Sequence, residues 1–122
     1  IKTAIVLTTD GARKAMVYDS ILAMHHIKAV YPGEILQSAV TDIIYNGVKA
    51  GLNTKDASLF NRELALLESE HNAITILGCT ELPVAVNLYQ LEGNFLDPTT
   101  VLARAAIREA GYPVAEKSAG TL

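Results

Sequence analysis

The chain has one cysteine, no tryptophan and few aromatic residues, which make up 6% of its 122 residues. A single cysteine cannot form an internal disulfide, which fits a reducing compartment, so we expect a cytoplasmic protein. The sequence also lacks a signal-peptide pattern and any apolar run near the roughly 18 residues of a membrane span. We therefore expect no membrane association.

Positive charge is also scarce. Ten Lys and Arg residues stand against 13 Asp and Glu residues, and the net charge is −3. Since the basic residues are dispersed, no face for nucleic acid is expected. Half of the residues are hydrophobic, and a chain of this length can bury roughly two thirds of its unfolded surface. We expect one α/β domain over residues 1–110, followed by a loosely held tail at residues 111–122.

Short runs of β-branched and apolar residues predict buried strands, because they are too short for helices. Apolar residues at helical spacing lie between them and predict helices. Gly51 is expected to end one helix as a C′ glycine, Thr54 to cap the next, and Asp97 to cap the last with Pro98 in its first turn. The expected strands are residues 4–8, 27–30, 73–77 and 94–96, and the expected helices are 12–24, 34–50, 54–71, one beginning near Pro83, and 99–110.

This alternation predicts an α/β fold of three layers, a short parallel sheet of about four strands with helices on both faces. Ligands of such sheets bind at the carboxyl ends of the strands. Polar turns follow three of the expected strands there, at residues 8–11, 78–81 and 97–99. These turns are the first places to look for a site.

Cys79 is the most informative residue, because it lies where a buried strand turns into a helix. One interpretation is a small buried hydrophobic residue, since free cysteine is among the most buried side chains. The other is chemical, since a helix N-terminus lowers the pKa of a thiol and stabilises its thiolate. Glu81 opposes that effect with a nearby negative charge, although its carboxylate also stabilises the helix end. Position favours a chemical role for Cys79.

Other polar residues near the predicted site are less specific. Thr8, Thr9 and Thr80 can donate hydrogen bonds to a carboxylate, but threonines also end strands and cap helices. Lys49 falls off the apolar stripe of its helix, so the pattern alone makes it a solvated surface lysine. The three histidines do not have the spacing of a zinc motif with Cys79, so no metal is expected.

The run Gly78-Cys79-Thr80-Glu81-Leu82 resembles the second cysteine motif of the aspartate/glutamate racemase family. Similar pieces appear in the family's order over nearly the whole chain. They are Thr9-Asp10-Gly11 with Tyr18, Pro32 and Gln37, Ile44-Tyr45 with Lys49 and Gly51, Asp97-Pro98-Thr99, and Leu102-Ala103-Arg104-Ala105. Ala12 departs from the pattern, because a threonine usually stands there and one potential hydrogen bond is lost.

The resemblance implies cofactor-independent racemisation of a small dicarboxylic amino acid, aspartate or glutamate, in which two bases on opposite faces move the α-proton. Cys79 would be one of the two bases. Thr80 and neighbouring amides would hold the α-carboxylate, Thr9 would line the pocket, and Lys49 would meet the acidic side chain, with Glu81 also at the substrate. Because family members are about twice as long, the resemblance also implies a preceding half, or a partner lobe, that holds the other cysteine. It leaves a homodimer open.

Two alternatives remain beside the racemase. The first is a non-catalytic carboxylate-binding or assembly module in which Cys79 is structural. The second is a cysteine-dependent isomerase or decarboxylase acting on small dicarboxylates. A thiol that titrates near neutrality favours an enzyme, whereas one with an ordinary or higher pKa favours the binding module.

Overall fold

A computed structural model describes residues 2–111 and 113 of the chain. Four parallel strands form one sheet in the order β2-β1-β3-β4. Six α-helices and one π-helical segment connect and follow the strands, so the predicted α/β class and strand number are confirmed. The strands are β1 (Lys2–Leu7), β2 (Ile27–Val30), β3 (Ile74–Leu77) and β4 (Phe95–Leu96).

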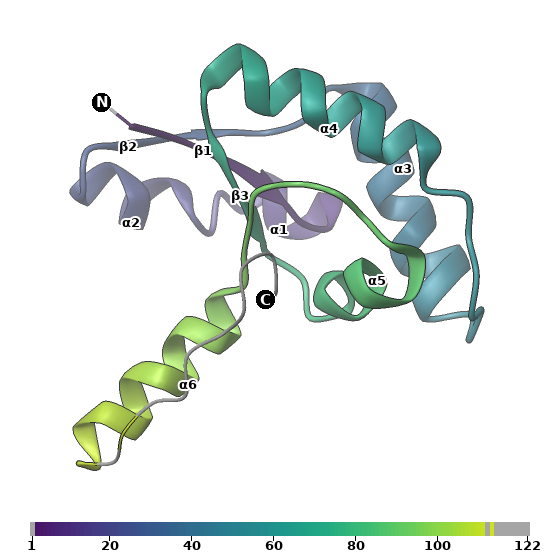
Figure 1. The fold of residues 1–122 in the computed structure, drawn as a ribbon. Helices are drawn as coiled ribbons and strands as arrows, with labels where there is room; N and C mark the ends of the chain where they lie inside the picture. Colours follow the sequence, from purple (N-terminus) through teal and green to yellow (C-terminus); the bar gives the residue numbers. More distant parts are fainter. Residues whose placement is uncertain (1, 112, 114–122) are drawn as a thin grey trace.

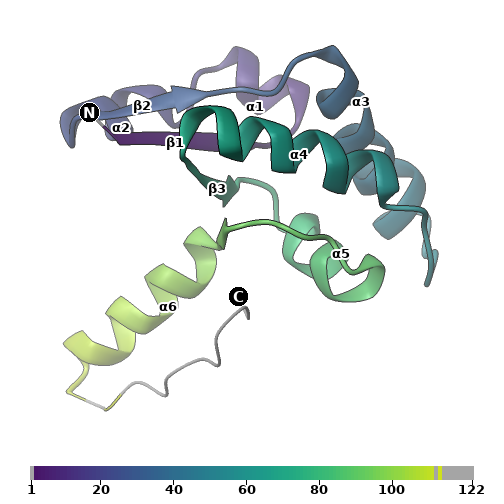
Figure 2. The same ribbon diagram turned by 45° about the horizontal axis from the view of Figure 1, so that its top comes forward.

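The connections place helices on both faces of the sheet (Figures 1 and 2). Two short helices link β1 to β2, two longer ones link β2 to β3, one links β3 to β4, and the last follows β4. The π-helical segment η1 continues α3 without a break. The helices are α1 (Asp10–Lys14), α2 (Asp19–Met24), α3 (Glu34–Ile43) with η1 (Ile44–Val48), α4 (Ser58–His71), α5 (Glu81–Tyr89) and α6 (Pro98–Glu109).

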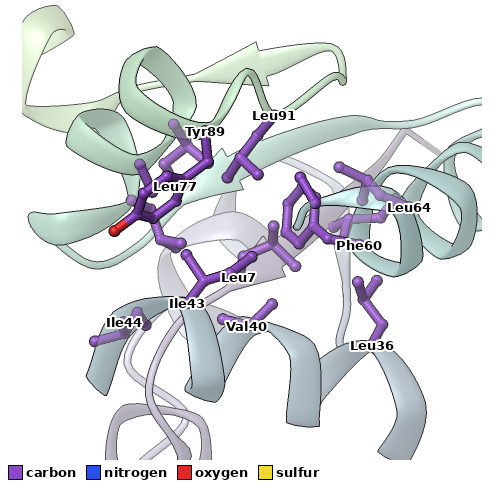
Figure 3. Close-up of a cluster of buried hydrophobic side chains, with 14 of the residues drawn as sticks. Leu7, Leu36, Val40, Ile43, Ile44, Phe60, Leu64, Leu77, Tyr89 and Leu91 are labelled. Atoms are coloured by element: carbon purple, nitrogen blue, oxygen red, sulfur yellow. The ribbon is translucent and has the colours of Figure 1, made fainter. Parts of the chain in front are cut away.

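The larger part of the core lies on the face covered by α3, α4 and α5 (Figure 3). Side chains of a strand alternate between the two faces, so Ile5 and Leu7 of β1 join this cluster. Ala4 and Val6 point to the opposite face and pack against Tyr18 and Leu22 beside the shorter helices. All four side chains are buried, because β1 is an inner strand with both faces covered.

The single helix expected over residues 12–24 is wrong, because the chain forms α1 and α2 with a break between them. Met16 has a left-handed backbone conformation, with φ of 52°, which a continuous helix does not allow. Most of the apolar residues that suggested the helix are exposed, Met24 for example by 77%. Only Leu22 of that set packs against the sheet. Without a buried stripe, nothing selects one continuous helix over two short ones.

Thr54 does not cap α4, which begins four residues later at Ser58. The carboxylate of Asp56 instead accepts hydrogen bonds from the backbone N–H of Ser58 at 2.9 Å and from its hydroxyl at 2.6 Å. An aspartate satisfies free amides at the start of a helix at least as well as a threonine does. Three residues of the expected apolar face of α4 are buried, namely Ala57, Phe60 and Leu64.

The long helix was expected to run to residue 50 and end at Gly51, but its last helical residue is Val48 and its C-cap is Lys49. Gly51 lies in the turn that follows, with φ of 77°. Its backbone N–H donates to the Val48 carbonyl at 3.0 Å, which closes the last turn. The loosely held tail was expected at residues 111–122, and all but Gly111 and Pro113 of that stretch lies outside the described residues. Within the described part of the chain, no helix combines the length and the apolar character that crossing a membrane requires.

Helix α6 extends away from the sheet (Figures 1 and 2), and none of its residues is buried. Its first turn therefore depends on local interactions. As predicted, Asp97 caps it and Pro98 occupies the first turn, with the Asp97 carboxylate accepting from the Thr99 N–H at 3.0 Å and the Thr100 hydroxyl at 3.0 Å.

We expect Asp97→Ala to cost α6 about 1 kcal/mol of local stability, because the cap is lost and no burial compensates. Since α6 adds nothing to the core, the change should appear as faster amide hydrogen exchange in residues 99–109, with the exchange of β1 unchanged. Equal exchange in α6 of both proteins would contradict the capping role.

Candidate functional site

The chain leaves the sheet in opposite directions after β1 and β3, which are neighbours in the middle of the sheet. From β1 the chain crosses to β2 on one side, and from β3 it crosses to β4 on the other. The carboxyl ends of two such strands form the crevice where open α/β sheets bind ligands. The loop at Thr8 and Thr9 and the loop from Gly78 to Thr80 both begin there, so two of the three predicted polar turns meet at this point.

Hydrogen bonds join these two loops directly. The Thr8 hydroxyl donates to the Gly78 carbonyl at 3.2 Å, and the Gly78 N–H donates to the Leu7 carbonyl at 2.7 Å. From α3, the Gln37 amide Nε2 donates to the Thr8 carbonyl at 3.0 Å. Thr8 and Gln37 are both buried, so their hydrogen bonds support the two loops from below.

Gly78 is required by the close approach of the two loops. A Cβ at this position would lie 3.0 Å from the Leu7 carbonyl oxygen, 3.1 Å from the Tyr18 ring and 3.2 Å from the Thr8 Cβ. The carbonyl oxygen belongs to the backbone of the central strand, so it has little room to move away. The glycine thus brings the next residue, Cys79, close to β1.

Cys79 is half-buried and lines a cavity of about 110 Å³. Its thiol donates a hydrogen bond to Glu81 Oε2 at 2.9 Å. Cys79 also packs against the larger core cluster, so the residue lies between the core and an opening at the carboxyl end of the sheet. The cavity is lined by Tyr18, Leu77, Gly78, Cys79, Thr80, Asp97, Pro98 and Thr99, so the third predicted polar turn contributes to it as well.

The expected lowering of the thiol pKa is wrong for this structure. Burial raises the pKa of Cys79 above its ordinary value, and the hydrogen bond and negative charge of Glu81 raise it further. A backbone hydrogen bond from Glu81 and the charge of Lys49 act in the opposite direction but are the smaller effects. At neutral pH Cys79 is consequently a protonated thiol.

Glu81 is the most connected side chain of the site. Its Oε2 accepts from the Cys79 thiol and, at 3.0 Å, from the Thr80 hydroxyl, and its Oε1 lies 3.7 Å from the Lys49 ammonium. The Cys79 hydrogen bond is the main cause that lowers the pKa of Glu81. Glu81 is therefore a carboxylate at neutral pH, and its contact with Cys79 joins an anion to a thiol.

Lys49 reaches the site because its helix changes geometry just before it. The Lys49 N–H donates to the Ile44 carbonyl at 2.9 Å, five residues back, which is the π-helical pattern of η1. The wider turn rotates Lys49 away from the position that a regular helix predicts. Its side chain is 44% exposed, as the pattern predicts, and its ammonium lies 4.7 Å from the centre of the Tyr45 ring and 3.7 Å from Glu81 Oε1, so Lys49 is an exposed lysine with two partners.

The π-helical turn packs against α5 at Gly47. A Cβ on Gly47 would lie 3.0 Å from the Tyr89 hydroxyl oxygen and 3.0 Å from Lys55 Cδ. The Tyr89 hydroxyl donates to the Leu52 carbonyl at 2.7 Å, just past the end of the helix. These contacts hold the segment that carries Lys49 against the helix that carries Glu81.

Of the five residues predicted for the site, four come together. Cys79, Thr80, Glu81 and Lys49 are linked by hydrogen bonds and an ion pair, whereas Thr9 is not part of this network. Of the five, only Cys79 and Thr80 line the cavity. The Thr9 hydroxyl accepts from the Ala12 N–H at 3.3 Å and caps α1, the structural role that threonine also has.

Sequence reasoning did not assign roles to Tyr45 or Asp97 at the site, although both positions were noticed for other reasons. Tyr45 lies beside the Lys49 ammonium, and Asp97 lines the cavity with Tyr18. An aromatic residue four positions before a lysine is a pattern that fits cation–π contact on a helix. Among residues 2–111 and 113, no three His, Cys, Asp or Glu side chains are grouped so that they could hold a metal ion. A search of protein-family models finds none that matches this chain.

Proposed function

We propose that this chain is one lobe of a cofactor-independent racemase of acidic amino acids, in which Cys79 is one of two groups that move the α-proton. The observation that carries the proposal is the grouping of a thiol, a carboxylate and an ammonium at the carboxyl end of the sheet. Lys49 and Cys79 come from segments 30 positions apart in the sequence, so the grouping is a product of the fold. The resemblance described above supports the same activity.

Each group has a task in this reaction. Removal of an α-proton leaves a carbanion, so the reaction needs a proton acceptor on one face of the α-carbon, a donor on the other, and positive charge for the carboxylates. Cys79 supplies the proton-transfer group on one face of the α-carbon. The Lys49 ammonium attracts the side-chain carboxylate of aspartate or glutamate. The Thr80 hydroxyl and the first free amides of α5 are available to the α-carboxylate.

The described residues enclose only part of such a ligand. A cavity of about 110 Å³ is smaller than the few hundred cubic ångströms of a typical small-molecule site. The only thiol of the chain also leaves the opposite face of the α-carbon without a base. The proposal therefore includes a second lobe that closes the site and carries the other base.

The test is to incubate the full-length gene product with L-aspartate or L-glutamate in deuterium oxide. Racemisation with deuterium at the α-carbon supports the proposal. Product analysis with maleate and substituted malonates is run in parallel, and turnover of those compounds alone would assign a dicarboxylate isomerase or decarboxylase instead. Binding of the amino acids by calorimetry without any exchange would contradict the racemase.

One observation favours a non-catalytic carboxylate-binding module as the second candidate. The raised pKa of Cys79 keeps its thiol protonated at neutral pH, whereas a resting base would be a thiolate. A protonated thiol is nevertheless what the donor side of a two-base reaction requires. The exchange experiment separates the two functions.

We expect Lys49→Met to raise the KM for aspartate by about tenfold, because the variant keeps the length of the side chain but loses the charge that attracts the substrate carboxylate. Lys28→Met removes the same charge from an exposed position on β2 and is the matched control. Steady-state racemisation kinetics measure both. An unchanged KM for Lys49→Met would remove this lysine from the substrate site.

A further inference from the structure

Glu81 is the point of contact between the thiol and the cation of the site. Its Oε2 is 2.9 Å from Cys79 Sγ and 3.0 Å from the Thr80 hydroxyl, and its Oε1 is 3.7 Å from Lys49 Nζ. The Glu81 side chain is 25% exposed, so solvent only partly screens these contacts. The carboxylate is anchored on one side by Lys49 and accepts the thiol hydrogen bond on the other.

Four ionisable groups surround Cys79. Glu81 follows it on α5, Lys49 approaches from the end of η1, and Tyr18 and Asp97 line the same cavity from the segments before α2 and α6. Among the described residues, Glu81 is the side chain that accepts a hydrogen bond from the sulfur. The pKa of Tyr18 is raised by burial and by Cys79, so Tyr18 is neutral at pH 7 and places no negative charge beside the sulfur.

We infer that Glu81 is a positioning residue that holds Cys79 as a protonated thiol in the empty site, so that Cys79 begins the reaction as the proton donor. This inference rests on the proposed function and assigns the starting state of one of its two groups. The contact requires a hydrogen on the sulfur, because a thiolate and a carboxylate at 2.9 Å would repel each other. Glu81 is not itself the proton acceptor, since its pKa is lowered.

The proton balance of the step follows from this assignment. A general base of the thiolate class on the second lobe takes the α-proton and leaves its electron pair on the α-carbon. That carbon then takes the proton of Cys79, so the S–H bond breaks as the new C–H bond forms. The thiolate that remains receives the backbone hydrogen bond from Glu81 and lies near the positive charge of Lys49, the two influences that favour its charged form.

The experiment measures the thiol itself and requires no turnover. Wild type and Glu81→Gln are alkylated with iodoacetamide between pH 6 and pH 10, and the ultraviolet absorbance of the thiolate is followed over the same range. We expect Glu81→Gln to react about threefold faster at pH 7, because a larger thiolate fraction outweighs the lower nucleophilicity of a less basic thiolate. Glu70→Gln removes the same charge from an exposed position on α4 and should match wild type.

A pH profile of Glu81→Gln identical to that of wild type would overturn the inference, whether or not the protein is a racemase. If the pH profile of alkylation shifts but the protein has no racemase activity, the result would support the protonated state of Cys79 and refute the proposed racemisation. If circular dichroism shows that Glu81→Gln does not fold, the comparison uses Glu81→Ala, which removes the carboxylate that accepts the thiol hydrogen bond. Faster alkylation of that variant at pH 7 supports the inference, and an unchanged rate contradicts it.

Discussion

Under the proposed function, replacement of Cys79 by serine is expected to reduce α-proton exchange by about 10³-fold. The hydroxyl of serine is close in size to the thiol but is a far weaker acid, so it neither donates nor accepts a proton at the α-carbon at a useful rate. Because Cys79 is half-buried beside a cavity, the change is not expected to disturb the core. Deuterium incorporation into aspartate and glutamate measures the loss.

The control for this prediction is Thr99→Ser, which removes one methyl group from the lining of the same cavity without touching the thiol. We expect that variant to keep most of its activity. If Cys79→Ser exchanges the α-proton at a rate close to that of wild type, the sulfur is not a proton-transfer group, and the carboxylate-binding module becomes the better assignment.

The second large effect is structural. We expect Phe60→Ala to lower the free energy of unfolding by about 3 to 5 kcal/mol, because it removes a large buried ring and leaves a cavity. Phe60 is 1% exposed and packs against Phe95 with their ring centres 6.5 Å apart. It belongs to the cluster of Leu7 and Leu64 shown in Figure 3, which supports the inner strand behind the site.

Urea unfolding followed by circular dichroism tests this expectation. Leu66→Ala lies on the same helix, but its side chain is 62% exposed, so we expect a change within about 0.5 kcal/mol. Because domains of this kind are stable by about 5 to 15 kcal/mol, the Phe60 variant loses a large part of its stability. Equal midpoints for the two variants would mean that this cluster does not stabilise the fold as described.

The sequence predicted elements best where burial and local pattern agree. The stripe from Leu36 to Val48 is buried along most of its length, and the helix is continuous. The apolar residues between Met16 and Met24 have a similar spacing but are mostly exposed, and the chain breaks at Met16. Spacing shows that a residue can face a core, but only the tertiary structure decides whether a core lies there.

The position of the site was predictable, while its electrostatics were not. A cysteine between a strand and a helix lies at the carboxyl end of a parallel sheet by topology alone. Whether the pKa of Cys79 is raised or lowered depends on burial and on the orientation of the Glu81 side chain, and the motif determines neither. The helical wheel correctly predicted that Lys49 is exposed, but its contact with Glu81 depends on how η1 packs beside α5, which the sequence pattern does not show.

The hydrogen bond from Thr8 to Gly78 has a consequence for how the protein acquires its site during folding. Its partners are 70 residues apart in the sequence, and the pairing of β1 with β3 on which it depends spans a similar length of chain. Closing so long a loop costs entropy before any contact repays it, so pairings of this kind form slowly and late. A nascent or partly folded chain therefore carries its thiol beside Thr80 and Glu81 but without Lys49 and the loop after β1, and the candidate site is complete only with the finished sheet.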